Sequence, residues 1–253
     1  MRPLSALGWI ALLGAALGAG PERSAGPAPP SLAPRAWIWA WERPEDLRFL
    51  GGRPDVGVAV LARTVTVGDA GVVVHRRAQP ALLAEGTPRA AVVRVELLRG
   101  SSRFEAHGRA LAEAILEGAR DVPGDLLQID FDAPPRAWPL YREVLAEVRR
   151  GVRPAMVVSI TAIAAWCARA VPVVEPDDDV LVVPMLFAMG ADAPRVHLAL
   201  AARGDFADPR CRRALGVMAG EARPRLPQRP IWIFSRRALG PADLSALTPA
   251  EDP

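Results

Sequence analysis

Short apolar runs recur along the chain, and helix-like stretches separate most of the later ones. The runs that we predict to be strands cover residues 36–41, 56–65, 90–97, 126–133, 155–162, 179–187, a weakly defined 211–219, and 231–238. An added hairpin strand is expected at residues 72–77, after the Gly68-Asp69 turn. Helices are predicted near residues 105–120, 138–150 and 191–202.

About eight strands in alternation with helices favour a parallel sheet with the helices outside. The length of 253 residues fits an α/β fold of the (β/α)8 TIM type, irregular in places, with an extra hairpin after the second strand. An open doubly wound sheet is the alternative, but the first strand is not followed by the GxGxxG sequence that a nucleotide site would need. We expect residues 36–253 to form a single domain.

Polar residues alternate with apolar ones in three successive predicted strands. They are Arg94 and Glu96 in the first, Gln128, Asp130 and Asp132 in the second, and Ser159 and Thr161 in the third. Because successive side chains of a strand point to opposite faces, the apolar set should meet the helices and the polar set should look into the barrel. Unpaired charges there cost several kcal/mol each, so we expect them to be paired or to face a ligand.

The acidic members of this set are the candidate catalytic residues, since sites in such barrels gather at the carboxyl ends of the strands. We predict Asp132 as the general acid/base, Asp130 as an ionised partner held by Arg94, and Glu96 as the second carboxylate. Three carboxylates beside one arginine should raise at least one carboxyl pKa, as glycoside hydrolysis requires. Gln128, Ser159 and Thr161 are predicted to orient these groups around a substrate.

Two other interpretations of these residues stay open. Arg94 and Asp130 could form a buried structural ion pair while Asp132 caps the following helix. The carboxylates of Asp130, Asp132 and Glu96 could also bind a divalent cation, although their spacing is not diagnostic. Our prediction is that the protein has no metal and no cofactor.

Tryptophans form a second pattern at the start of the fold. Trp37, Trp39 and Trp41 share one face of the first predicted strand. We expect Trp37 and Trp39 to pack in the core, and Trp41, at the strand end, to stack on a sugar ring.

The first residues read as a secretory signal, with Arg2, an apolar stretch from Leu4 to about Leu17, and small residues after it. We predict a signal peptide at 1–19, cleaved near residue 19, and a Pro/Gly-rich tether at 20–35, so that the mature protein is periplasmic or secreted and has no membrane span. That compartment permits a disulfide between Cys167 and Cys211, which the sequence cannot establish.

The composition and the absence of certain motifs argue against several classes of partner and activity. All 31 basic residues are arginines, interspersed with the 28 acidic ones, and no basic block is interleaved with aromatics. The net charge of +3 therefore does not indicate nucleic-acid binding. No HExxH, GxSxG or Walker sequence is present, which disfavours zinc protease, α/β-hydrolase and nucleotidase functions.

Three stretches, "QIDFDAPPRAWPLYREVLAEVR", "VVSITAIAAWC" and "VLVVPMLFAMG", together resemble the bacterial family catalogued as domain of unknown function 3142. The resemblance covers roughly residues 36–190 and implies a barrel related to glycoside hydrolases, without naming a reaction. "IDFDAP" is also similar to the strand-four signature of family 18 chitinase-like barrels, whose aspartates Asp130 and Asp132 match. Pro134 stands where that signature has its acidic glutamate, and Leu127 replaces its first aspartate.

Together these observations predict an exported, monomeric, carbohydrate-active protein that acts on a polysaccharide or a cell-envelope glycan. The alternative, which Pro134 favours, is a barrel that binds such a glycan without cleaving it.

Overall fold

The computed structural model describes residues 34–222 and 224–243. The predicted signal peptide, and the predicted tether up to residue 33, lie outside these residues. Within the described ranges, no helix has the length and apolar character needed to cross a membrane.

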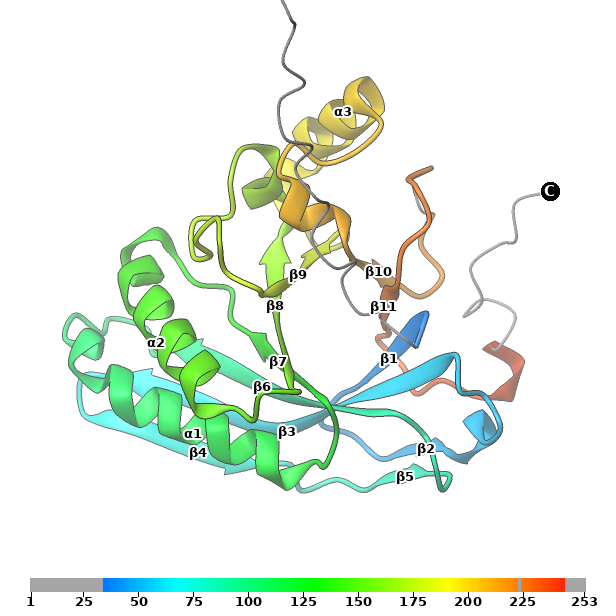
Figure 1. Ribbon diagram of the computed structural model, residues 1–253, viewed down its shortest axis with the longest axis horizontal. Coiled ribbons are helices and arrows are strands. Elements are labelled where there is room, and N and C mark those ends of the chain that lie inside the picture. The colour runs from blue at the N-terminus through cyan, green and yellow to red at the C-terminus, as the bar shows by residue number, and fades with distance from the viewer. Residues whose placement is uncertain (1–33, 223, 244–253) are drawn as a thin grey trace, which may run out of the picture. The chain divides into compact units, whose positions relative to one another are not determined.

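Eight parallel strands close into a barrel, which confirms the predicted α/β fold of the TIM type (Figure 1). In order around the barrel they are β1 (Ala36–Ala40), β3 (Val56–Gly68), β6 (Arg89–Leu97), β7 (Leu126–Asp130), β8 (Val157–Ile163), β9 (Leu181–Met185), β10 (Leu215–Met218) and β11 (Ile231–Phe234). The barrel closes where β11 pairs with β1, in the register Trp37 with Trp232. Each of the eight predicted barrel strands overlaps one of these.

The second barrel strand carries the predicted hairpin. β4 (Gly71–Arg76) runs antiparallel to the second half of β3. Gly71, with φ of 130°, makes the tight turn between them. A small parallel sheet of β2 (Glu45–Leu47) and β5 (Ala81–Leu83), which the sequence analysis did not predict, lies apart from the barrel strands.

Three α-helices occupy the predicted positions. They are α1 (Gly108–Asp121), α2 (Trp138–Gly151) and α3 (Ala193–Arg203). The short 3-10 turns are η1 (Arg48–Leu50), η2 (Phe104–His107), η3 (Pro135–Ala137), η4 (Ala164–Ala168), η5 (Gly190–Asp192), η6 (Pro209–Arg212) and η7 (Pro241–Asp243). Among the described residues no α-helix joins β10 to β11, so the barrel is irregular.

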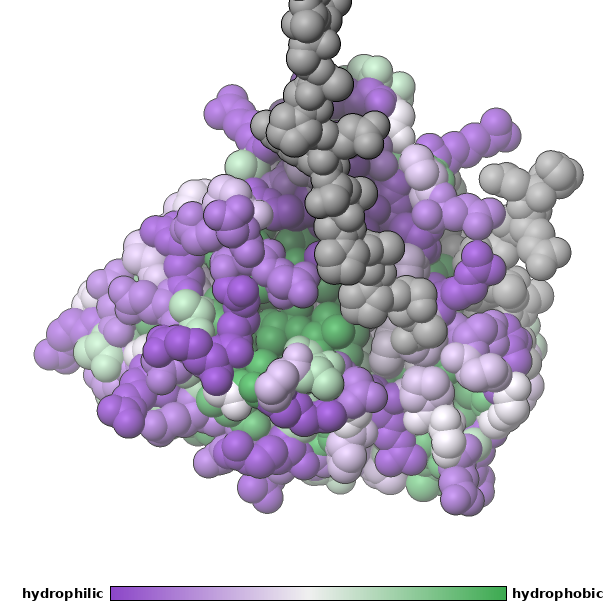
Figure 2. All heavy atoms as spheres, viewed as in Figure 1, coloured by the Kyte–Doolittle hydropathy of each residue, from purple (hydrophilic) through white to green (hydrophobic). Residues whose placement is uncertain are grey.

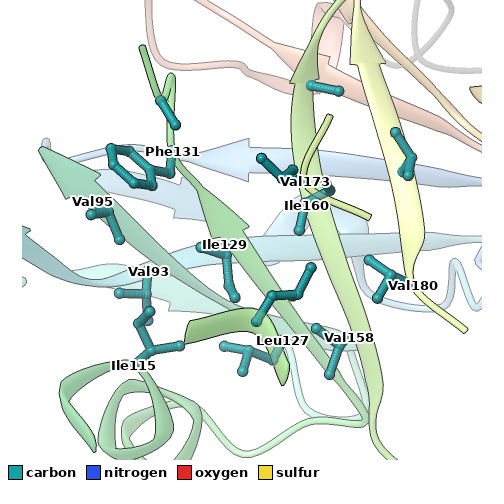
Figure 3. Close-up of a cluster of buried hydrophobic side chains, with 14 of the residues drawn as sticks. Val93, Val95, Ile115, Leu127, Ile129, Phe131, Val158, Ile160, Val173 and Val180 are labelled. Carbon is teal, nitrogen blue, oxygen red and sulfur yellow. The ribbon is translucent and has the colours of Figure 1, made fainter. Parts of the chain in front are cut away.

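The apolar residues divide into an outer cluster and a smaller cluster inside the barrel. Figure 3 shows the outer one, where Val93, Ile129 and Ile160 project from neighbouring strands on the side of the sheet that carries α1. Gly118 permits the close approach of α1, because a Cβ there would lie 2.4 Å from Cγ2 of Val93. Figure 2 shows mainly hydrophilic side chains over α1 and α2, and hydrophobic surface in the hollow near the middle of the view.

The inner cluster contains Trp37, Trp39 and Trp232, all buried, with the rings of Trp37 and Trp232 stacked at 5.9 Å. The expected core position of the first two tryptophans is thus confirmed. The structure also joins Cys167 and Cys211 in a disulfide, which the sequence analysis left open. This bond ties η4, which follows β8, to η6, which precedes β10.

Candidate functional site

The candidate site lies at the carboxyl ends of β6, β7 and β8, three neighbouring strands of the barrel. Arg94 on β6 is in register with Asp130 on β7, and its Nη1 donates to Asp130 Oδ2 at 2.9 Å. The Nε of the same guanidinium donates to Glu96 Oε1 at 2.9 Å. Thr161 on β8 donates its hydroxyl to the other oxygen of Asp130, Oδ1, at 2.7 Å. Four of the predicted site residues therefore form one hydrogen-bonded network.

Asp130 is the buried carboxylate of this network, with only 3% of its surface exposed. Burial raises its pKa to about 6, and the negative charge of Asp132 contributes in the same direction. The guanidinium of Arg94 and the hydroxyl of Thr161 lower the pKa and partly offset these two effects. The Arg94–Asp130 pair that we considered as a structural alternative is thus present.

Asp132 differs from Asp130 in its exposure and in its partners. Its side chain is exposed, and no hydrogen bond or ion pair from residues 34–222 or 224–243 reaches its carboxylate. Desolvation by the protein around it nevertheless raises the Asp132 pKa, while the charge of Arg94 lowers it. The suggestion that Asp132 caps the next helix is wrong, because Pro134 is the N-cap of η3 and Ala137 is the N-cap of α2.

Gln128 and Ser159 lie one step deeper in the barrel than Asp130 and Thr161. They are fully buried and in register with each other, and the Gln128 amide donates to the Ser159 hydroxyl at 3.4 Å. The Gln128 Oε1 has no hydrogen-bond partner among the described residues. Both side chains therefore support the floor beneath the carboxylates, without a hydrogen bond to them in the described part of the chain.

Trp41 adjoins the charged network through Arg94. The Cζ atom of Arg94 lies 5.1 Å from the centroid of the Trp41 ring, within the range of a cation–π contact. The Trp39 ring lies 4.3 Å from the same ring, centroid to centroid. Trp41 thus packs against both of these neighbours, and its role as a stacking surface for a sugar stays a prediction.

Arg77, which the sequence analysis missed, holds the end of β1 and so places Trp41. Its guanidinium donates to the carbonyl oxygens of Ala40 at 3.0 Å, of Arg43 at 2.7 Å, and of Trp41. In the same direction, the two backbone amides that follow Arg77 donate to a carboxylate oxygen of Glu42, each at 3.0 Å. No sequence pattern marks Arg77, since its bonds to the end of β1 go to backbone oxygens more than 30 residues away.

The arrangement of the carboxylates bears on whether they could bind a metal ion. Among the residues that the structure describes, no group of three or more His, Cys, Asp or Glu side chains is arranged to hold a metal ion. The divalent-cation interpretation of Asp130, Asp132 and Glu96 is therefore not supported.

The fold and the position of this site define an α/β-barrel protein with a polar, acidic cluster where barrel enzymes keep their active sites. No family model matches the chain, and no curated protein matches it. The resemblance to domain of unknown function 3142 stays a prediction.

Proposed function

We propose that this protein is an exported carbohydrate-active enzyme of the glycoside-hydrolase type, with its site at the carboxyl ends of β6, β7 and β8. The observation that carries the proposal is the contrast between two neighbouring carboxylates. Asp132 is exposed and has no partner in the described ranges, whereas Asp130 is buried and held by Arg94 and Thr161. Two carboxyl groups in different environments are what the cleavage of a glycosidic bond uses.

In this mechanism Asp132 protonates the oxygen of the leaving group. Its raised pKa keeps a larger share of the carboxyl protonated near neutral pH than an ordinary aspartate would have. Asp130, with a pKa of about 6, is mostly ionised at neutral pH and is fixed in place by its two hydrogen bonds. Glu96, which is exposed and held by Arg94, serves as the second carboxylate toward the sugar.

A barrel that binds a glycan without cleaving it is the second candidate. The observation that favours it is the engagement of Glu96 and Asp130 by the same guanidinium, which leaves Asp132 as the one carboxylate of the three without an ion pair among the described residues. Pro134, at the position of the acid in chitinase-like barrels, favours it as well.

Export is part of the proposal and rests on the N-terminal sequence pattern. The Cys167–Cys211 disulfide supports it, because disulfides persist in oxidising compartments outside the cytoplasm. A polysaccharide or cell-envelope glycan is the proposed partner, and a monomer the proposed state.

Turnover of a polysaccharide panel by the mature protein tests the enzyme assignment. Asp132→Asn should reduce turnover by about 100-fold or more, since a positioned acid contributes at least that factor. Asp177→Asn is the matched control, because Asp177 is exposed and distant in sequence from the site. Equal turnover by Asp132→Asn and the control would remove the assignment. Glycan binding that persists in Asp132→Asn, with no product from either protein, would establish the binding barrel.

A further inference from the structure

Two barrel strands, β3 and β6, continue beyond the rim of the barrel next to the candidate site, and β4 joins them there. β1 ends at Ala40, which pairs with Val60 of β3, but β3 runs on to Gly68. Beyond that point β4 takes the place of β1 beside β3, while β6 stays on its other side as far as Leu97. The extension is therefore a sheet in the order β4, β3, β6 that leaves the barrel at its carboxyl end.

A β-bulge decides which side chains of β3 this extension presents. The pairing of β3 with β6 shifts between Leu61 and Arg63, so that the alternation of faces changes there. Val65 and Val67 become fully buried on the outer side, where α1 packs. Thr64 and Thr66 then fall on the face that continues the barrel interior, where both are half-buried.

The exposed face of the extension is continuous with the candidate site. We call it the platform; its members are Thr64 and Thr66 of β3, Val73 and His75 of β4, and Arg94 and Glu96 of β6. One row of the sheet runs His75, Thr64, Arg94, Asp130 across four neighbouring strands. At the usual spacing of strands this row is about 14 Å long.

Exposure decreases along this row in the direction of the site. His75 is exposed, Thr64 and Arg94 are half-buried, and Asp130 is buried. A second row, Val73 with Thr66 with Glu96, lies beside it, and Val73 is 55% exposed. The platform thus presents hydroxyl, imidazole and small apolar groups on an open surface that leads to the carboxylates.

We propose that the platform binds the units of an extended, linear polysaccharide on one side of the bond that is cleaved or recognised. This inference rests on the proposed function and adds to it a polymeric substrate class with several sugar subsites. Three features support a glycan chain as the occupant: continuity with the carboxylate site, hydrogen-bonding groups that suit sugar hydroxyls, and a charge content limited to the internally paired Arg94 and Glu96 plus one histidine.

The test compares the affinity of matched disaccharides and hexasaccharides from cellulose, chitin, chitosan, mannan and polygalacturonate, measured by calorimetry with the full-length mature protein. We expect one series in which the hexasaccharide binds at least about tenfold tighter than the disaccharide. The double variant Thr66→Ala/His75→Ala should reduce this ratio by about tenfold, because each lost hydrogen bond weakens binding several-fold. Val74→Ala is the matched control: Val74 lies on β4 as well, but on the opposite face, and should keep the wild-type ratio.

The outcomes separate the inference from the proposed function. Binding or cleavage that does not depend on chain length, or a length dependence unchanged in Thr66→Ala/His75→Ala, overturns the platform and leaves the barrel site standing. The platform is also overturned if Val74→Ala reduces the hexasaccharide-to-disaccharide affinity ratio as much as the double variant does. The effect would then come from a general change in β4 and not from the face that carries Thr66 and His75. If no glycan of the panel binds or is cleaved, both the platform and the proposed function fail.

Discussion

Replacement of Asp130 by asparagine should change how the stability of this protein depends on pH. The Asp130 pKa is raised from 3.8 to about 6 in the folded protein, so the folded state binds this proton more tightly than the unfolded chain. The stability that the protonated group contributes is therefore complete below about pH 4 and is lost as the pH rises through about 6. At about 1.4 kcal/mol per pKa unit the whole shift corresponds to about 3 kcal/mol, of which about 2.4 kcal/mol is lost between pH 4 and pH 7.

Asparagine has nearly the same shape and does not titrate, so Asp130→Asn should lack this pH dependence. The substitution also alters the hydrogen bonds with Arg94 and Thr161. This alteration should shift the plot of unfolding free energy against pH by a constant amount, without changing its slope. Urea unfolding followed by circular dichroism, at intervals between about pH 4 and pH 8, gives the free energy of unfolding for both proteins. The difference in free energy of unfolding between wild type and variant should change by about 2.4 kcal/mol across this range.

Asp177→Asn provides the control, since its exposed carboxylate should leave the profile parallel to that of the wild type. Parallel profiles for Asp130→Asn as well, within about 1 kcal/mol, would mean that the buried carboxylate does not carry the raised pKa that the structure implies. The description of Asp130 as a buried carboxylate with a raised pKa would then have to be withdrawn.

Three further changes test the packing around the barrel, each by urea unfolding against the wild type. Gly118→Ala should destabilise the protein by about 1–3 kcal/mol, because its new Cβ would overlap Val93 and push α1 from the sheet; an unchanged stability would contradict this close approach. The double change of Cys167 and Cys211 to alanine should cost about 2–4 kcal/mol, as expected for a bond that closes a 44-residue separation, and reductant should affect the wild type but not the variant. Arg63→Met should lower the free energy of unfolding by about 1 kcal/mol near neutral pH, because it removes the ion pairs of this guanidinium with two carboxylates of α1. These carboxylates have lowered pKa values, so the loss should become smaller as the pH falls below about 4. A loss that grows in acid would refute the pairing.

The barrel was predictable because two sequence patterns indicate its strands, namely the alternation of apolar residues and the residues that bound each run. Apolar residues face the helices at every second position, and the short runs are bounded by proline, glycine and charged residues. The network of Arg94, Asp130 and Thr161 could be predicted for the same reason, since polar residues on one face of neighbouring parallel strands must meet inside the barrel.

The features that escaped prediction depend on contacts between distant segments or on a break in periodicity. Strict alternation from Val60 would put Thr64 and Thr66 on the helix side, and only the pairing with β6 reveals the bulge that turns them toward the platform. β2 and β5 have three residues each, too few to show a period. Arg77 binds carbonyl oxygens, which every residue has, so its role has no sequence signature.

The pairing of β1 with both β3 and β11 has a consequence for how the chain reaches its native state. The first strand pairs with the last one, so one backbone edge of this tryptophan-rich strand has no partner until a segment almost 200 residues downstream has been made. Contacts of such long sequence separation form slowly and leave an unsatisfied edge that invites aggregation. A chain truncated before residue 231 would keep that edge permanently, and we expect it to be retained by chaperones or degraded rather than to accumulate as a smaller barrel.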